Sequence, residues 1–259
     1  MSTPTVGLPS VAPPFAWGSR EDLVWLDAPL AGAHAAFSTR LGGQSEGPYE
    51  SLNLGILTHD EPARVRRNRD LLADALGREA GGVAMGRQVH GAEVQVRAGP
   101  PAPGDELARV DAQVTSSADV TPFVLVADCI PLAIAGRGDV AMVHCGWRGV
   151  AAGIVERALA AVHGPVGAAI GPGIGVCCYE VGDDVRDAFR ARGHDGETMP
   201  DGRLDLALVV RRELERLGVP SSSISACGLC TSCHPELFFS HRRDGGVTGR
   251  QAGLVWLGS

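Results

Sequence analysis

Apolar residues occur along the chain in short runs that alternate with segments of helical spacing. Runs of three to seven mostly apolar residues, bounded by Gly, Pro or polar residues, are typical of buried strands. Strands are expected at 34–39, 83–89, 92–96, 113–115, 122–127, 132–135, 140–143, 166–170 and 253–257. Apolar positions three and four residues apart predict helices at 149–162, 183–192 and 204–217. Many strands with helices between and outside them predict a layered α/β (α+β) domain.

A further helix is expected between Asp60 and Gly77. Asp60 is a preferred N-cap, Pro62 suits the first turn, and Gly77 is a typical C-terminal stop. Its apolar face holds Val65, Leu72, Ala75 and Leu76. Asn68 lies on that same face, and a buried amide needs hydrogen-bond partners, so we expect Asn68 to cap or brace a nearby loop.

Composition places the chain among globular proteins. Of 259 residues, 44% are hydrophobic and 20% are charged, which is close to the globular average. We expect a Pro-rich arm at residues 1–14 and a single domain at residues 15–259. The net charge of −7 and the absence of a basic stripe argue against nucleic-acid binding.

Nothing in the sequence resembles a membrane span or a secretory signal, so a cytoplasmic location is expected. The seven cysteines are then expected to be thiols, ligands or nucleophiles rather than disulfides, and their odd number agrees.

Three side chains follow apolar runs and could meet at one edge of a sheet: His90, Cys129 and His144. A Cys and two His can hold Zn²⁺ with one position open for water or substrate, as catalytic zinc sites do. Asp128 could orient a histidine as a neighbouring carboxylate. The alternative is structural, because a lone His after a strand is commonly a turn residue and a lone Cys a small buried hydrophobe.

Two other motifs could carry chemistry. Gly146-Trp147-Arg148-Gly149 begins a helix, where free N–H groups and Arg148 could bind an anion; the alternative is an ordinary strand–helix turn. The cluster Cys227, Cys230, Cys233 and His234 suggests a metal site, but it crowds all four side chains into eight residues. Structural zinc sites usually take two separated pairs of ligands, so we rank this cluster below the dispersed triad.

Ordered motifs cover nearly the whole chain after the Pro-rich arm. They are FSTRLGGQSEGPYESLNLG (37–55), DEPARVRRNRDLLADALG (60–77), QVHGAEV (88–94), DAQVTSSADVTPFVLVADCIPLAI (111–134), HCGWRGVAAGIVERAL (144–159), AAIGPGIGVCCYEVGDDV (168–185), LDLALVVRRELERLGV (204–219) and LCTSCHPELFFSHRRDGGVTGRQAGLVWL (229–257). In these motifs and their order the chain resembles the YfiH-type family, also called the laccase-domain or multicopper polyphenol oxidoreductase family. Bacterial members are also named peptidoglycan editing factor.

The resemblance implies a fold of mixed β-sheets covered by helices. It implies that His90, Cys129 and His144 are the metal ligands, and that Cys230 and Cys233 line or brace the site. It also implies phosphorolysis of purine nucleosides (adenosine, inosine, guanosine and methylthioadenosine), with adenosine deaminase activity besides.

Copper-dependent phenol oxidation, the older activity of the family, fits the residues less well. Multicopper chemistry needs many histidines, and of the eight in the chain only His90 and His144 stand at the metal-ligand positions that the resemblance implies. Zn²⁺ is therefore the expected cofactor, with copper as the less favoured choice.

The leading hypothesis is a zinc-dependent purine nucleoside phosphorylase that acts as a monomer or homodimer. Arg40 and Arg148 are candidates to position phosphate, since a planar guanidinium suits an oxyanion. Asn53 and Asn68 are candidates for hydrogen bonds to substrate or to a loop.

Two alternatives remain open. One is a cysteine hydrolase or amidase that edits a peptidoglycan precursor, with Cys129 as nucleophile and a histidine as base. The other is a zinc-stabilised binding module without turnover. Two departures from the family pattern bear on specificity: Cys145 could compete as a ligand, and His241 could tune substrate contacts.

Overall fold

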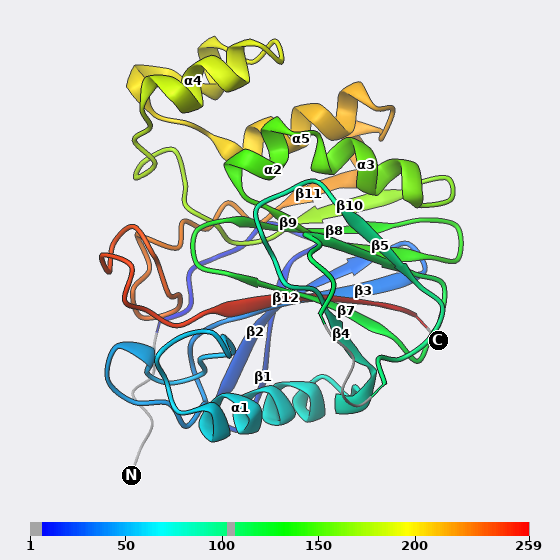
Figure 1. The fold of residues 1–259 in the computed structure, drawn as a ribbon, viewed down its shortest axis with the longest axis vertical. Coiled ribbons are helices and arrows are strands. Elements are labelled where there is room, and N and C mark those ends of the chain that lie inside the picture. The colour runs from blue at the N-terminus through cyan, green and yellow to red at the C-terminus, as the bar shows by residue number, and fades with distance from the viewer. Residues whose placement is uncertain (1–6, 103–106, 259) are drawn as a thin grey trace.

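The computed structural model describes residues 7–102 and 107–258, and within them two mixed β-sheets pack face to face (Figure 1). The first has the order β1 (Ala16–Arg20), β2 (Leu23–Leu30), β3 (Ala33–Ser38), β12 (Gln251–Leu257), β7 (Thr121–Val126), β4 (Val83–Met85). The second has the order β11 (Ile224–Ala226), β10 (Gly167–Ile170), β8 (Ile130–Ala135), β9 (Val140–Cys145), β6 (Ala112–Thr115), β5 (Val94–Arg97). Neighbours pair antiparallel except β4–β7, β5–β6 and β10–β11, which are parallel.

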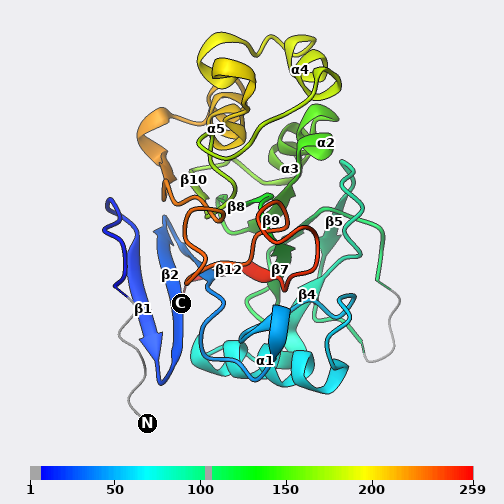
Figure 2. The same cartoon turned by 90° about the vertical axis from the view of Figure 1, so that its left-hand side faces the viewer.

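Helices cover the outer faces of both sheets, so the expected layered fold of mixed sheets and helices is confirmed. Helix α1 (Pro62–Ala75) packs on the first sheet, with Leu72 against Phe123 and Leu254 in one core. Helices α2 (Trp147–Ala151), α3 (Ile154–Ala161) and α5 (Leu206–Arg216) pack on the second sheet, and α4 (Asp183–Arg190) lies farthest from the sheets (Figures 1 and 2). Short 3₁₀ turns occupy Gly47–Tyr49, Ala80–Gly82, Gly196–Thr198, Pro200–Gly202 and Ser221–Ser223. In the part of the chain that the structure describes, no helix combines the length and apolar character needed to cross a bilayer.

Strand β9 shows how alternation assigns side chains to layers. Val140 and Met142 lie in the core between the sheets, whereas Ala141, Val143 and Cys145 lie in the core under the helices. Successive side chains of a strand point to opposite faces. His144 therefore belongs to the face between the sheets, and Cys145 to the opposite one.

Several element bounds differ from the sequence prediction. The strand expected at 83–89 ends at Met85, and strands β1, β2 and β11 were not anticipated. The helix expected at 149–162 is two helices, because Gly153 adopts φ +88° between them. The N-cap of α1 is Glu61 rather than Asp60, since the Asp60 carboxylate accepts hydrogen bonds from Ser45 and Asn53 as well as from the Glu61 N–H.

The expected N-terminal arm is described only from residue 7 onward; residues 1–6 lie outside the described part. Val11 packs against the core between the sheets, and the indole of Trp17 donates a hydrogen bond to the carbonyl of Pro9 at 2.8 Å. Residues 7–14 are thus attached to the domain.

Candidate active site

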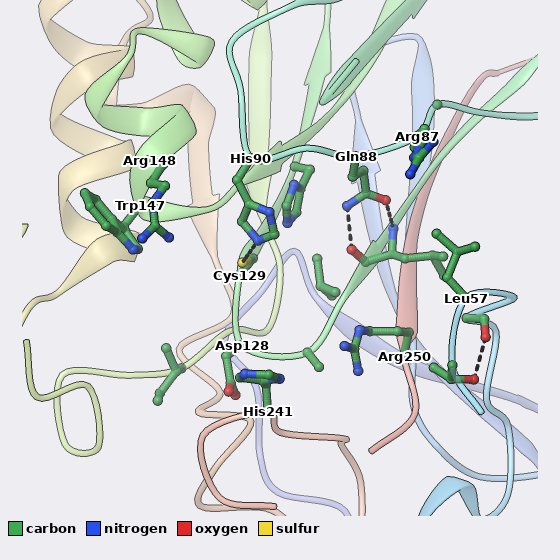
Figure 3. A pocket seen from close by; sticks show the side chains of 18 of the residues that line it. Leu57, Arg87, Gln88, His90, Asp128, Cys129, Trp147, Arg148, His241 and Arg250 are labelled. Atoms are coloured by element: carbon green, nitrogen blue, oxygen red, sulfur yellow. Dashed lines mark hydrogen bonds between the residues drawn. The ribbon is translucent and has the colours of Figure 1, made fainter. Parts of the chain in front are cut away.

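A cavity of about 1030 Å³ opens at the place where the chain passes from β7 of the first sheet to β8 of the second. Asp128 and Cys129 form that connection, and both line the cavity. Further parts of the wall come from the segment 55–58, the loop after β4, the end of β9, the start of α2, the loop after β10 and the segment 241–250 (Figure 3), with single residues at Leu107 and Leu206. Segments that are far apart in the sequence meet here, because the chain crosses from one sheet to the other at this point.

His90, Cys129 and His144 come together on this wall. One ligand atom from each lies within 4.8 Å of the others, and the Cys129 Sγ is 3.8 Å from the His90 Nε2. The two imidazole rings meet edge to face with centroids 4.8 Å apart. The three side chains converge as the sequence analysis expected, although His90 lies on a loop and His144 within β9 rather than after strand ends.

Asp111, just before β6, organises this group, and the sequence analysis missed it. Its carboxylate accepts hydrogen bonds from the backbone N–H groups of Val89, His90 and Gly91 at 3.1, 2.9 and 2.8 Å. The same carboxylate lies 2.8 Å from the His144 Nδ1. These bonds hold His90 in a left-handed conformation, φ +58°, which a non-glycine residue adopts only when its surroundings require it.

The contact with Asp111 also fixes the tautomer of His144. The Asp111 carboxylate accepts the Nδ1 proton, so Nε2 is the His144 atom at which a metal ion would take the place of a proton. Asp128, the carboxylate expected in this role, has other partners: its oxygens accept bonds from the Thr231 hydroxyl at 2.6 Å and the Arg242 N–H at 2.7 Å. The adjacency of Asp128 to Cys129 was thus a misleading signal, and Asp128 braces the 231 and 242 loops instead.

The electrostatics of the group favour a thiolate. Burial alone would raise the pKa of the Cys129 thiol, but the charge of His144 and hydrogen bonds from His144 and His90 lower that pKa to about 6. Burial lowers the pKa of His144, yet the Cys129 thiolate and Asp111 raise it to about 9. The thiolate is the form of cysteine that binds metals and attacks electrophiles.

The backbone leaves space for a metal centre. A Cβ added at Gly146 would lie 2.7 Å from the His90 Cδ2 and 3.3 Å from the Cys129 Sγ. Gly146 therefore allows the three side chains to close around one point. Two nitrogen donors and one sulfur donor suit a metal ion with an open coordination position, so these residues fit such an ion.

Cys145 does not join the group. It is fully buried in the core beneath α2 and α3, on the opposite face of β9 from His144. Burial raises the pKa of its thiol well above the ordinary value. Because side chains alternate along β9, Cys145 points away from the metal-binding group and cannot compete as a ligand there.

Arg148 lines the cavity, as the sequence analysis expected, and Figure 3 shows it beside Trp147 near His90. Its guanidinium carbon lies 4.3 Å from the centroid of the Trp147 ring. Among the described residues it forms no ion pair or hydrogen bond through its side chain, so its donors are available. Because α2 is only five residues long, its dipole adds little, and binding of an anion depends on the guanidinium itself.

Arg40 lies outside the cavity lining. Its guanidinium donates to the carbonyls of Glu50 at 2.7 Å and Pro235 at 3.0 Å, and it stacks 4.5 Å from the centroid of Phe239. The side chain therefore braces two loops, and the expectation that Arg40 positions phosphate finds no support in this geometry.

Asn53 and Asn68 are buried and serve loops, the second of the two roles expected for them. The Asn68 amide donates to the Ser45 hydroxyl and to the carbonyls of Ser51 and Asn53, and its oxygen accepts from the Gln44 N–H. The Asn53 oxygen accepts from the N–H groups of Gly55 and Arg250 at 3.0 and 2.9 Å. Asn53 thereby fixes the backbone of Arg250, which does line the cavity.

Several cavity residues were not singled out from the sequence. Gln88 pairs through both ends of its amide with the backbone of Leu125, at 2.7 and 2.8 Å, and so anchors the His90 loop to β7. Arg250 approaches the Cys129–His90 pair from the side opposite Arg148 (Figure 3). Tyr179 and Arg242 stack with 5.2 Å between guanidinium carbon and ring centroid. The sequence did offer a signal for two of these residues. Gln88 stands in the motif at 88–94, two residues before His90, and Arg250 stands in the motif at 229–257, directly before β12. His241, noted as a departure from the family pattern, lines the cavity too.

Comparison with known proteins gives consistent matches over most of the chain. A family described as "Multi-copper polyphenol oxidoreductase laccase" matches residues 34–258. "Purine nucleoside phosphorylase YlmD" of Geobacillus stearothermophilus is 36% identical over 249 residues, covering 88% of this chain and 91% of that protein. "Purine nucleoside phosphorylase" of Deinococcus radiodurans is 40% identical over 243 residues, covering 90% of this chain and 92% of that protein. The crystal structure of YlmD from Geobacillus stearothermophilus superimposes with a TM-score of 0.85 at 34% identity, over 95% of this chain and all of the other.

Proposed function

The chain belongs to the multi-copper polyphenol oxidoreductase laccase family, and we propose that within this family it is a zinc-dependent purine nucleoside phosphorylase. The names of its relatives from Geobacillus stearothermophilus and Deinococcus radiodurans support this activity. So does the site, which joins a metal-binding group to a cavity with cationic walls.

The observation that carries the proposal is the placement of Arg148 beside the His90–Cys129–His144 group in one cavity of about 1030 Å³. That volume is at the upper end of small-molecule sites, roughly 300–1,000 Å³, and leaves room for a nucleoside together with phosphate. The Arg148 guanidinium forms no ion pair or hydrogen bond with the described residues, and such a group is suited to bind a phosphate oxyanion.

His90, Cys129 and His144 would hold the zinc ion. Zn²⁺ bound by two imidazoles and a thiolate would supply a Lewis acid beside the cavity, able to polarise an oxygen or lower the pKa of a water molecule. The argument for zinc is the donor set of two nitrogens and one sulfur, together with a carboxylate that orients a histidine. The family description names copper, so a metal analysis of the protein would have to exclude copper.

In phosphorolysis a phosphate oxygen forms a bond to the ribose C1′ while the bond from C1′ to the purine nitrogen breaks. Arg148 would hold the phosphate and orient one oxygen toward C1′, an effect of positioning rather than of covalent chemistry. The departing base gains electron density and needs a hydrogen-bond donor. Tyr179, which lines the cavity, would serve as this donor, because burial, together with the nearby Cys129 charge, raises the pKa of its phenol to about 12 and keeps it protonated.

Apolar side chains would enclose the purine. Leu57, Leu107, Leu125 and Trp147 all line the cavity, and Leu57 is 84% exposed. An exposed leucine at a cavity mouth is suited to cover a flat heterocycle and to exclude water from it.

Adenosine deamination is part of the proposal as a second reaction of the same site. It needs a water molecule at the purine C6 rather than phosphate at C1′, and both positions lie within one nucleoside. A cytoplasmic location and a monomeric or homodimeric state complete the proposal.

One observation favours a different chemistry. The lowered pKa of Cys129 and its 3.8 Å distance from His90 also suit a cysteine nucleophile acting on a peptidoglycan amide. Turnover by the metal-free protein, abolished by alkylation of Cys129, would establish this alternative; the phosphorylase proposal requires activity to vanish with the metal.

The testing experiment incubates the full-length protein with adenosine, inosine, guanosine or methylthioadenosine, with and without phosphate, and resolves the products by mass. The free base and the ribose 1-phosphate (or its 5-methylthio form) in equal amounts, only with phosphate, is the expected result. Inosine formed from adenosine without phosphate would establish deamination. Intact nucleosides in every reaction would refute the proposal.

A further inference from the structure

A second group of sulfur atoms gathers away from the His90–Cys129–His144 group, between the loops that follow β10 and β11. These two strands are parallel neighbours, so their carboxyl ends lie at the same edge of the sheet. A backbone bridge between Gly173 and Cys230 continues the pairing past the strands. The loop after β10 brings Cys177 and Cys178 to this edge, and the loop after β11 brings Cys230 and Cys233.

The four thiols lie close enough to share one ion. Their Sγ atoms all lie within 4.8 Å of one another, and the Cys233 Sγ is 3.5 Å from both the Cys177 Sγ and the Cys178 Sγ. A tetrahedral zinc tetrathiolate with Zn–S bonds of about 2.3 Å places its sulfurs about 3.8 Å apart. Only small side-chain shifts separate the observed cluster from that geometry.

This set differs from the cluster that the sequence suggested. Cys227 is buried in the core between the sheets, and His234 faces Glu236 with its Nδ1 3.2 Å from the carboxylate. Two cysteines from a loop about fifty residues earlier take their places. The ligands thus come as two separated pairs, as in most structural zinc sites. The sequence motif lacked this arrangement, and for that reason it was ranked below the dispersed triad.

We propose that Cys177, Cys178, Cys230 and Cys233 form a second metal site, a tetrathiolate that binds Zn²⁺ and joins the loops after β10 and β11. Four thiolates in a tetrahedral arrangement select zinc, or iron in its sulfur clusters, over hard cations. Binding displaces the thiol protons to solvent, and no electron transfer is involved.

The backbone around the cluster is arranged for sulfur. The Gly175 N–H donates a hydrogen bond to the Cys230 Sγ at 3.1 Å, the kind of contact that orients a metal-bound thiolate. A Cβ at Gly175 would lie 3.1 Å from the Cys230 Cβ and 3.3 Å from the Cys177 Sγ, so a glycine keeps the space clear. Cys177 and Cys233 are exposed, which provides an entry path for the ion.

A disulfide explains the cluster less well. It would use two of the four sulfurs and needs one defined partner for each, at a bond length of about 2.05 Å. Cys233 is equally close to Cys177 and Cys178, and all four cysteines are free. A shared ion satisfies all four at once.

The site would act on the cavity through the chain. Tyr179, next to Cys178, lines the cavity. Thr231, next to Cys230, donates its hydroxyl hydrogen bond to Asp128, the neighbour of Cys129. An ion held between the loops would fix both residues, so the second site is a positioning element for the wall of the first.

The test titrates the metal-free, reduced full-length protein with Co²⁺, whose thiolate charge-transfer absorption grows with the number of sulfur ligands, and then displaces it with Zn²⁺. Wild type is expected to bind two equivalents. His90→Ala/His144→Ala should keep one, with the strong absorption of four thiolates. Cys178→Ser/Cys233→Ser should keep one with much weaker absorption, and the matched control Cys227→Ala, a cysteine of the same motif outside the cluster, should keep both. A histidine variant that binds no Co²⁺ by thiolates, or a cysteine variant that still binds two equivalents, would overturn the proposal.

A second measurement needs no substitution. Reduced wild-type protein receives the Zn²⁺ that fills the His90–Cys129–His144 group, and one half of the sample receives one further equivalent. Both halves are treated with iodoacetamide, and the labelling of each cysteine is followed by peptide mass. Protection of Cys177, Cys178, Cys230 and Cys233 together is expected. Equal labelling with and without the added zinc, or disulfides among these cysteines in the freshly isolated protein, would contradict the site.

Discussion

The Asp111 carboxylate lies 2.8 Å from the Nδ1 of His144 and accepts three consecutive backbone N–H groups around His90. One side chain thus orients one candidate ligand through its ring and another through its backbone. Burial would raise the pKa of Asp111, but hydrogen bonds from His144 and from the backbone lower it below its ordinary value, so the carboxylate is ionised near neutral pH.

Asp111→Asn is expected to weaken zinc binding by about 10- to 100-fold, the usual cost of removing a carboxylate that orients a histidine ligand. Competition with a chromophoric chelator measures the affinity. Asp128→Asn is the matched control, because Asp128 is adjacent to Cys129 but bonds to Thr231 and Arg242; it should change the affinity much less. The reverse ranking of the two variants would show that Asp111 does not organise the site.

Gly146→Ala is expected to weaken zinc binding by at least about tenfold. The added methyl group would lie 2.7 Å from the His90 ring, and the backbone of Gly146, at φ −79°, accepts alanine, so the effect is steric. Gly91→Ala adds a methyl group beside the same histidine with contacts no shorter than 3.5 Å and serves as the control. Equal zinc affinity for Gly146→Ala and wild type would mean that the three side chains do not close on one point.

Arg148→Ala is expected to raise the KM for phosphate. A hydrogen bond to a charged group contributes roughly 1.5–3 kcal/mol, which corresponds to a change of about 10- to 100-fold. The KM for nucleoside should change far less. Arg157→Ala removes an exposed arginine of α3 that pairs with Glu93 and should leave both constants unchanged. An unaltered KM for phosphate in Arg148→Ala would move the phosphate site elsewhere in the cavity.

Glu213 in α5 gives the fold a pH dependence that is independent of the cavity. Burial would raise the pKa of this carboxyl group, but hydrogen bonds from Arg216, His194 and Arg192 lower it from 4.5 to about 2. Because the folded state binds the proton more weakly than the unfolded state, the stabilisation is complete above about pH 4.5 and is lost as the pH falls toward 2.

Glu213→Gln should lower the free energy of unfolding near neutral pH by about 3 kcal/mol, the cost of breaking a buried ion pair. It should also flatten the fall in stability between pH 4.5 and 2. Denaturant titrations at several pH values measure both effects. Glu215→Gln, whose partner Arg211 is 3.8 Å away at a more exposed position, should have little effect. If the free energy of unfolding fell with pH equally in Glu213→Gln and in wild type, Glu213 would not be the source of this pH dependence.

The sequence could predict much of the layered fold and the convergence of the metal-binding group, because both follow from local signals. Apolar runs mark strands such as β8 and β9, and each ligand stands in a short motif. It could not predict Asp111 as their partner, since its contacts with His90 and His144 bridge residues more than twenty positions apart. The local cue, Asp128 beside Cys129, pointed to the wrong carboxylate.

The cysteines and Arg40 show the same limit. The spacing of Cys227, Cys230 and Cys233 suggested one motif, but Cys227, directly after β11, lies in the core between the sheets. The loop after β10 instead brings Cys177 and Cys178 to Cys230 and Cys233. Arg40 had the right chemistry for phosphate, yet its donors are used by backbone carbonyls of two loops. Whether a polar side chain serves the fold or a ligand depends on partners that only the tertiary structure supplies.

The most direct test of the proposed function measures ribose 1-phosphate formed from inosine and phosphate by metal-free protein, before and after reloading with Zn²⁺ or Cu²⁺, in wild type and Cys129→Ala. The proposal predicts no product from the metal-free protein, restored turnover with zinc in wild type, and a loss of at least about 100-fold in Cys129→Ala. Turnover by the metal-free protein, restoration by copper alone, or full activity of Cys129→Ala would contradict a zinc-dependent phosphorylase centred on His90, Cys129 and His144.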